Sequence, residues 1–215
     1  TEGLGELRER ICQVMDHEGA SARPEDIIVT TGGQQAIDLA IRTFVDPGDV
    51  VLAEGPTYPG AVPSFTTYEA DVVHIPMDDD GLRVDLLEER FEHLAAQNRR
   101  PKLLYTIPTF HNPAGVTMSL ERRERLVRFA HSNELLLVED NPYGQIRYEG
   151  EPLPTLWELD AGAGWVIYLS TFSKILAPGL RTGWVAAPQQ VLRKMNLGKQ
   201  AADLCSSTVS QRLIV

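Results

Sequence analysis

The sequence is poor in several features that would mark a particular functional class. It has only two cysteines, Cys12 and Cys205, which are too few and too far apart for a disulfide framework or a cysteine metal cluster. Its formal net charge of −10 argues against a nucleic-acid backbone as the main partner, because binding one requires a basic face. No apolar run approaches a membrane span, and no secretory signal is visible. We therefore expect a cytoplasmic protein with no membrane contact and no nucleic-acid contact by this segment.

The chain also lacks the glycine-rich motifs that most nucleotide-binding domains carry. No Gly-x-Gly-x-x-Gly follows an expected strand, and no Gly-Lys-Ser or Gly-Lys-Thr closes a phosphate loop. A nucleotide-binding α/β domain stays open only if Lys174 and Asp140, discussed below, do not share a site. His17, His74 and His93 have no metal-ligand spacing and are expected in solvent, so no metal is predicted.

What the sequence does have is a composition suited to one large domain. Its 215 residues are 43% hydrophobic, which is enough for a substantial core. We therefore assign residues 1–215 to a single domain. A helical pattern begins directly after Thr1, and another continues to Val215. Both ends look like cuts within a longer protein, so we expect a fragment.

Short apolar runs alternate with helical patterns along the chain. Such nearly uninterrupted runs are typical of strands that are buried on both faces of a parallel sheet. The sequence therefore predicts an α/β fold, a three-layer α-β-α sandwich with a mostly parallel sheet. Strands are expected at residues 27–30, 50–53, 71–75, 102–107, 135–138, 165–169 and 183–187. Helices are expected at residues 4–15, 35–41, 59–67, 84–97 and 119–132, and from residue 189 onward.

Three local expectations follow from composition. Ser119 is expected to cap the helix that it opens, because a serine side chain can accept a bond from a free N–H group there. The Pro- and Gly-rich residues 149–164 are expected to form a long surface excursion. A basic run is expected on the exposed face of the helix after Ser119: Arg122, Arg123, Arg125 and Arg128.

Unusual polar chemistry collects in segments that directly follow expected strands. In an open α/β sheet, ligands bind beyond the carboxyl ends of the strands. We therefore expect these segments to meet at one rim, and their convergence carries more weight than any single motif. The segments are residues 31–35, 108–115, 139–143 and 170–174.

Lys174 has the most specific chemistry at this rim. It follows the apolar run 165–169, and Arg181 comes shortly after it. A lysine amine can form a Schiff base with a carbonyl cofactor, while Thr171, Ser173 and Arg181 can hold a phosphate. Taken alone, however, a lysine after a strand is more often simply solvated.

Two further positions suit the same ligand. Asp140 ends a very apolar strand, where a desolvated carboxylate needs a cationic partner such as a protonated pyridine nitrogen. A helix cap or a salt bridge is the plainer alternative. Gly33 and Gln34 place backbone N–H groups at a helix start, where anions are favoured, although an ordinary tight turn has the same pattern.

Three side chains could complete such a site. Asn112 lies before a proline and would be a rigidly presented amide, or an ordinary turn residue. Tyr143 could donate to a phenolate oxygen or fill the core with a satisfied hydroxyl. Tyr58 could stack on an aromatic ring or pack against the helix that follows it.

Together these segments resemble the class I/II aminotransferases, the fold-type I pyridoxal-phosphate enzymes. The matching motifs occur in the family's order and approximate spacing over nearly the whole chain. They are Gly-Gly-Gln-Gln-Ala at 32–36, Pro-Thr-Tyr at 56–58, His-Asn-Pro-Ala-Gly at 111–115, Glu-Asp-Asn-Pro-Tyr at 139–143 and Ser-Thr-Phe-Ser-Lys at 170–174, with Pro-Gly-Leu-Arg at 178–181. The residues of these motifs most resemble those of the branch of 2-aminoadipate and kynurenine aminotransferases, which also includes MocR-type transcription regulators.

The resemblance implies catalytic roles by position. Lys174 would form the Schiff base with pyridoxal 5'-phosphate and then carry a proton between substrate and cofactor. Asp140 would keep the pyridine nitrogen protonated. Asn112 and Tyr143 would bond the phenolic oxygen of the cofactor, and Tyr58 would stack on its ring.

It also implies a phosphate site and a reaction. The backbone around Gly33 and Gln34, with Thr171, Ser173 and Arg181, would hold the phosphate. The reaction would move an amino group from an amino acid to a 2-oxo acid. Homodimers are typical of the family, so one is expected by analogy alone.

Departures from the family pattern leave alternatives open. The N-terminal arm and C-terminal small domain are missing, and with them the arginine that grips the substrate carboxylate, so we expect weakened cofactor binding and poor turnover. A second interpretation is the pyridoxal-phosphate-binding effector domain of a MocR-type regulator. A third is a lyase, decarboxylase or racemase on the same fold, since one cofactor serves all these reactions.

Overall fold

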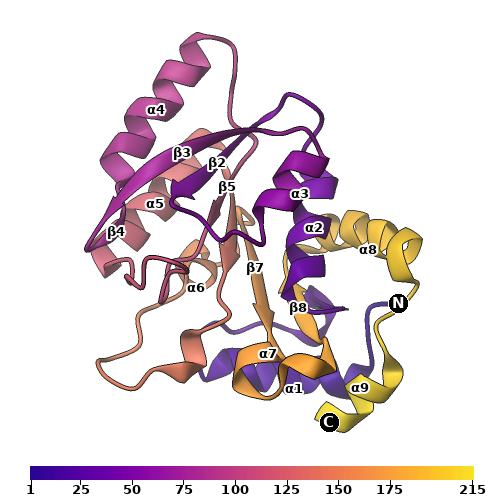
Figure 1. Ribbon diagram of the computed structural model, residues 1–215. Coiled ribbons are helices and arrows are strands. Elements are labelled where there is room, and N and C mark those ends of the chain that lie inside the picture. The colour runs from indigo at the N-terminus through magenta and orange to yellow at the C-terminus, as the bar shows by residue number, and fades with distance from the viewer.

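An eight-stranded sheet runs through the centre of the computed structural model, which describes residues 1–215 (Figure 1). The strands are β1 (Ile27–Thr30), β2 (Val50–Gly55), β3 (Asp71–Asp78), β4 (Gly81–Leu82), β5 (Leu103–Thr106), β6 (Leu136–Asp140), β7 (Val166–Thr171) and β8 (Gly183–Ala186). Their order in the sheet is β1-β8-β7-β6-β5-β2-β3-β4. Neighbours from β3 to β7 are parallel, whereas β8 is antiparallel to both β7 and β1. The mostly parallel sheet predicted from the sequence is therefore confirmed.

Helices cover both faces of this sheet, which explains why β1, β2, β5, β6, β7 and β8 are almost wholly buried. The helices are α1 (Gly5–Asp16), α2 (Gly33–Phe44), α3 (Val62–Thr67), α4 (Val84–Ala96), α5 (Leu120–Asn133), α6 (Leu156–Asp160), α7 (Phe172–Ile175), α8 (Gln189–Asp203) and α9 (Thr208–Ile214). Short 3-10 turns lie at Pro24–Asp26, Gly144–Ile146 and Pro178–Leu180.

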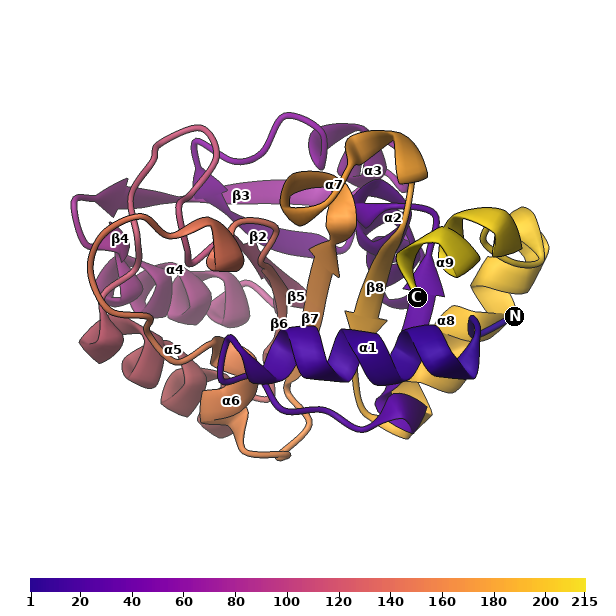
Figure 2. The same ribbon diagram turned by 90° about the horizontal axis from the view of Figure 1, so that it is seen from below.

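Two buried layers separate the helices from the sheet. On one face, α2, α3 and α8 pack apolar side chains such as Ile37, Phe65 and Met195 against the strands. On the other face, α4, α5 and α6 bury residues such as Leu87 and Leu126, while α1 covers β1 and β8. Figure 2 shows α1, α6 and α5 following one another along that second face. The three-layer sandwich predicted from the sequence is confirmed.

The direction of the strands places the site. Because β1 is parallel to β7, the carboxyl ends of β1, β2, β5, β6 and β7 all lie at one edge of the sheet. Each polar segment that the sequence analysis singled out begins at one of these ends. Their convergence at one rim is therefore a consequence of the topology.

Several boundaries differ from the sequence prediction. The helix expected from residue 59 begins at Val62, and β3 extends beyond the predicted residue 75 to Asp78. Ser119 is the N-cap of α5, as predicted, but its side chain makes no capping hydrogen bond. The helix expected from residue 189 to the end of the chain is divided into α8 and the short α9, and this break was not predicted.

The prediction that residues 149–164 form only a surface excursion is wrong in its second half. Thr155 caps α6 by accepting a hydrogen bond from the Glu158 N–H, and Leu156 is fully buried. The N–H groups of Leu156 and Trp157 donate to the buried Glu139 carboxylate at 3.0 and 2.9 Å. This segment therefore packs against β6 and contributes Leu156 to the hydrophobic core.

The basic run on α5 is not uniformly exposed, which corrects the sequence prediction. Arg123 is fully buried, and its guanidinium donates to the carbonyls of Met118, Pro154 and Pro108 at 2.8–2.9 Å. It also donates to Thr109 Oγ1 at 2.9 Å. Arg123 thus ties the loop after β5 to α5 and to the segment before α6.

Segments from the two ends of the chain lie side by side (Figure 1). The backbone N–H of Leu4 donates to Gln211 Oε1 at 2.8 Å, and Glu6 forms an ion pair with Arg212. None of the helices combines the length and the apolar character needed to cross a lipid bilayer.

Candidate active site

A cavity of about 210 Å³ opens at the rim where the strand ends meet. Every residue that the sequence analysis proposed for the site lines it: Gly33, Gln34, Tyr58, Asn112, Asp140, Tyr143, Thr171, Ser173, Lys174 and Arg181. Ile37, Ile107, Pro142 and Pro178 complete the wall. A larger cavity of about 650 Å³, between Arg23, Trp157 and Gln189, contains none of these residues. The chemistry therefore selects the smaller cavity.

One end of the cavity is built to receive an anion. The N-cap of α2 is Gly32, so no side chain caps the free N–H groups of the first turn, which begins at Gly33. The Arg181 guanidinium lies against this turn, since a Cβ on Gly32 would stand 2.6 Å from Arg181 Nη2. The carbonyl of Pro178, at 3.4 Å, is the only acceptor that the Arg181 side chain reaches. An unpaired cation beside free N–H groups is an arrangement suited to binding a phosphate.

The glycine at position 183 allows the strand β8 to approach that turn. A Cβ at Gly183 would lie 2.8 Å from the carbonyl carbon of Gly32 and 2.9 Å from the nitrogen of Gly33. Both distances are shorter than van der Waals contact, so any side chain here would push the turn outward. The close packing of two backbones therefore sets the position of the anion site.

Hydroxyl groups from β7 and α7 complete the anion end. Thr171 Oγ1 donates to the Thr182 carbonyl at 3.0 Å and accepts from the Ser173 N–H at 3.2 Å. It lies 3.0 Å from Ser173 Oγ. Thr171 is thereby the N-cap of α7, and the cap fixes the start of the turn that carries Lys174.

Lys174 lies in α7, the short helix that begins directly after β7. It lines the cavity, and its amine forms no ion pair with any residue of the chain. An amine held at a cavity wall without a carboxylate partner is free to react with a carbonyl group when it loses its proton.

Asp140 supplies a negative charge at the floor of the cavity. The residue is only 6% exposed, and Tyr105 Oη donates to its Oδ2 at 2.6 Å. Burial raises the pKa of Asp140 to about 6, the Tyr105 hydrogen bond opposes that rise, and the Glu54 carboxylate adds to it. No cation of the chain pairs with Asp140. A bound group with a protonated ring nitrogen would supply the missing partner.

Asn112, Tyr143 and Tyr58 line the remaining wall. Asn112 Nδ2 donates to Tyr143 Oη at 3.3 Å, so the two residues predicted to bind one ligand oxygen are neighbours. Burial raises the pKa of Tyr58, and the charges of Asp140 and Tyr143 act in the same direction. All three polar groups can therefore donate hydrogen bonds to an oxygen-rich aromatic ligand.

The sequence analysis missed the residues that support this floor. Glu54 is 1% exposed and accepts from Thr106 Oγ1 at 2.6 Å and from the Ile107 N–H at 2.9 Å. His111 Nε2 lies 3.0 Å from Glu54 Oε2, which ties the loop that bears Asn112 to β2. The sequence did contain a signal for Glu54, because a charged residue at the end of an apolar strand is expected to be buried and to need partners. Nothing in the sequence indicated the hydroxyl of Tyr105.

These groups fit a flat aromatic ligand that carries a phosphate, a basic ring nitrogen and a carbonyl group. The anion end offers free N–H groups and Arg181, the floor offers the unpaired Asp140, and the wall offers the Lys174 amine. Each part of the ligand thus meets a group of complementary charge or reactivity.

Comparison with known proteins gives a consistent result. The model of the family described as aminotransferase class I and II matches residues 1–215. An aromatic-amino-acid aminotransferase of Thermococcus litoralis is 52% identical over 86% of this chain and 44% of its own length. A 2-aminoadipate transaminase of Thermus thermophilus is 38% identical over 100% of this chain and 52% of its own length.

Solved structures agree. The kynurenine aminotransferase of Pyrococcus horikoshii, in complex with PMP, superposes with a TM-score of 0.93 at 45% identity. This similarity covers 98% of the present chain and 52% of that one.

Among the sequence relatives, an uncharacterized HTH-type transcriptional regulator of Bacillus subtilis is also similar, at 32% identity over 97% of this chain and 42% of its own length. The chain thus spans about half the length of these relatives.

Proposed function

We propose, from the premise that this chain belongs to the class I and II aminotransferases, that it binds pyridoxal 5'-phosphate and transfers an amino group from an amino acid to a 2-oxo acid. The observation that carries the proposal is the lining of one cavity by Lys174, Asp140 and Arg181. A reactive amine, a buried carboxylate and a phosphate-binding cation are the groups that this chemistry requires.

When bound, the cofactor supplies a carbonyl carbon and an electron-withdrawing ring. Arg181, Ser173, Thr171 and the first turn of α2 hold its phosphate and so fix its position. Asp140 accepts the ring N–H and keeps the proton on that nitrogen, because an ionised carboxylate without a partner is costly in a buried place.

Lys174 has two tasks in this proposal. Its Nζ would form the covalent link to the cofactor's carbonyl carbon, with the carbonyl oxygen lost as water, and would be released as a free amine when the substrate amine takes its place. The freed Nζ amine would be the base placed to take the proton from the substrate Cα and to give it back on the cofactor side, and water would then release the 2-oxo acid and leave the amino group on the cofactor. Asn112 and Tyr143 orient the ring through its oxygen, and Tyr58 covers one ring face.

The proposal predicts a defined spectroscopic result. The purified full-length protein with added pyridoxal phosphate should show a visible absorption band that is lost on borohydride reduction, with the reduced adduct on Lys174. An adduct on another lysine would refute the assignment of Lys174. No band in the full-length protein would refute the cofactor as well.

A regulator's effector domain is the second candidate, and the similarity to the Bacillus regulator supports it. Such a domain would bind the cofactor in the same way and turn over slowly. Product analysis separates the candidates, because an aminotransferase releases a 2-oxo acid, a decarboxylase releases an amine, and a sensor releases neither in quantity. A cytoplasmic location and a homodimer remain predictions from the sequence.

A further inference from the structure

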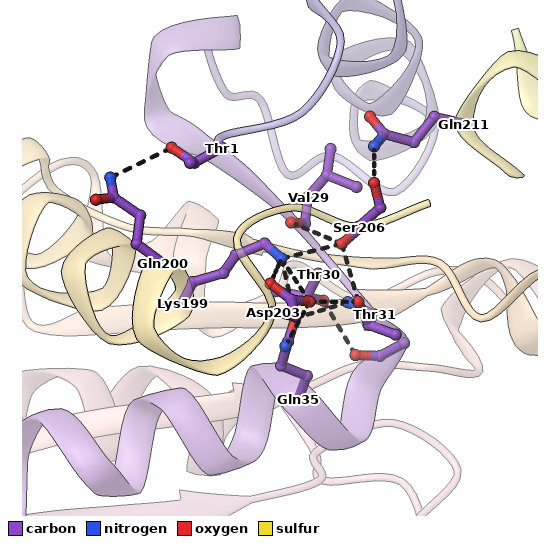
Figure 3. Close-up of polar contacts among 11 residues, drawn as sticks. Thr1, Val29, Thr30, Thr31, Gln35, Lys199, Gln200, Asp203, Ser206 and Gln211 are labelled. Atoms are coloured by element: carbon purple, nitrogen blue, oxygen red, sulfur yellow. Dashed lines mark hydrogen bonds and ion pairs between the residues drawn. The ribbon is translucent and has the colours of Figure 1, made fainter. Parts of the chain in front are cut away.

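A second lysine, Lys199, lies behind the anion end of the cavity and is completely buried. Its Nζ donates to Asp203 Oδ1 at 2.7 Å and Oδ2 at 2.9 Å, within the same helix α8. It also donates to Ser206 Oγ at 3.1 Å and to Gln35 Oε1 at 3.3 Å. Figure 3 shows these side chains converging from α8, α2 and the end of β1.

The partners of this ion pair flank the turn that opens α2. Thr31, just before Gly32, donates from Oγ1 to Asp203 Oδ2 at 2.7 Å. Gln35, just after Gln34, donates from Nε2 to the same oxygen at 2.8 Å. The Thr31 N–H donates in turn to Gln35 Oε1 at 2.8 Å. Both flanks of the turn are therefore fastened to one carboxylate.

The pair is more than a means of docking α8 onto α2. Apolar residues of α8, namely Val191, Leu192 and Met195, already pack in the core shared with α2. The polar bonds from Lys199 and Asp203 instead reach Thr31 and Gln35, the two residues that bracket the turn. Ser206, which accepts from Lys199, also donates to the Val29 carbonyl of β1 at 3.4 Å. Gly33 and Gln34 line the cavity, and because they open α2 their N–H groups have no acceptor within the helix.

We infer that Lys199 and Asp203 are positioning residues that hold the turn at residues 32–34 in the geometry required to bind the cofactor's phosphate. This inference rests on the proposed function and adds to it a support from two residues that do not line the cavity themselves. Backbone N–H groups bind an anion well only when they are already aimed at it. A turn anchored at both ends loses little further freedom when the anion arrives.

The test compares pyridoxal phosphate with pyridoxal, which lacks the phosphate. Thr31→Val removes one link to Asp203 and leaves the ion pair in place. In the full-length protein we expect it to weaken pyridoxal phosphate binding about tenfold, the effect of one lost hydrogen bond to a charged group, and to leave pyridoxal binding unchanged. Thr31→Ser keeps the hydroxyl and should retain wild-type affinity for both. Lys199→Met should shift the ratio of the two affinities in the same direction as Thr31→Val.

Two controls remove comparable groups elsewhere. Thr43→Val deletes a hydroxyl at the far end of α2, where it bonds only the Leu39 carbonyl. Asp160→Asn weakens a buried contact with His131 that lies far along the chain from the turn. Both should leave the ratio of the two affinities unchanged.

The outcomes are distinguishable. An equal loss of both ligands in Thr31→Val, or no loss of either, overturns the inference and leaves the proposed function intact. A wild-type protein that binds neither ligand overturns the proposed function, and this inference with it. If Lys199→Met fails to fold, Thr31→Val alone decides the matter.

Discussion

Two carboxylates near the same rim, the partly exposed Asp203 and the buried Asp140, differ in their hydrogen bonds and in the direction of their pKa shifts. Asp203 receives hydrogen bonds from Lys199, Thr31 and Gln35, and these offset the effect of burial so that the pKa of Asp203 is lowered. Asp140 receives one hydrogen bond, from Tyr105, and its pKa is raised to about 6.

The lysines show the same contrast. Lys199 has no exposed surface and bonds Asp203, Gln35 and Ser206, whereas Lys174 lines the cavity without an ion pair. A charge whose partners come from the chain supports the fold, and one left without partners is available to a ligand. The contrast between the paired charges and the open charges can be tested by changing each in turn.

The largest effect is expected from removing the open lysine. Lys174→Ala should lower the rate of amino-group transfer at least about a thousandfold, because no other group on the wall can carry the proton. Its melting temperature should match the wild type. Steady-state rates and thermal unfolding check both statements, with Lys194→Ala on the exposed side of α8 as the control. Residual activity near that of the wild type would remove Lys174 from the mechanism.

The next effect should come from neutralising the open carboxylate. The folded protein binds the Asp140 proton more tightly than the unfolded chain, so wild-type stability falls as pH rises from about 4 to about 6. Asp140→Asn avoids this loss and should make the cofactor-free protein about 3 kcal/mol more stable at pH 8, with no gain near pH 4. Denaturant unfolding at the two pH values measures the difference. A variant less stable than the wild type at pH 8 would contradict this account of the charge.

Breaking the paired charges should have the opposite sign. Lys199→Met leaves Asp203 without its cation and should destabilise the fold by about 2 kcal/mol, less than for a wholly buried pair because Thr31 and Gln35 still donate. Chemical denaturation at neutral pH gives this value. The double variant Lys199→Met with Asp203→Asn serves as the control and should recover part of the loss. If the single variant proves neutral, the pair is not the anchor described here.

The smallest effect on stability is expected from removing the one hydrogen bond that Asp140 receives. Tyr105→Phe removes the single hydrogen bond to Asp140 and should cost the cofactor-free protein about 1 kcal/mol at pH 8. The cost should shrink near pH 4, where Asp140 is protonated and needs the donor less. Phe65, which meets the Tyr105 ring edge-on at 5.7 Å, should keep its packing. A cost that does not depend on pH would mean that Tyr105 acts through packing alone.

The sequence predicted the sheet and the cavity wall because both depend on short local patterns. Apolar runs gave the strands, and the motif that follows each strand gave a residue on the wall, as at Asp140 after β6 and Lys174 after β7. The topology then brought these motifs together, since parallel strands end at one edge.

The supports behind the wall could not be predicted in the same way. The bond from Thr31 to Asp203 joins residues 172 positions apart, and no local pattern encodes such a pairing. Arg123 was missed for a different reason, because a run of arginines suggests solvent. Its position relative to the buried Leu126, Val127 and Ala130 follows the helical repeat and was the available signal.

The contact at Gly183 has a consequence for how this protein can vary. The residue does not line the cavity, yet a single added carbon would meet the backbone of Gly32 and Gly33 at less than 3 Å. In a library of random substitutions, even alanine at position 183 should therefore be selected against as strongly as changes to the cavity wall. Such data would suggest that position 183 belongs to the active site, although its only contribution is to have no side chain where the backbone of Gly32 and Gly33 packs.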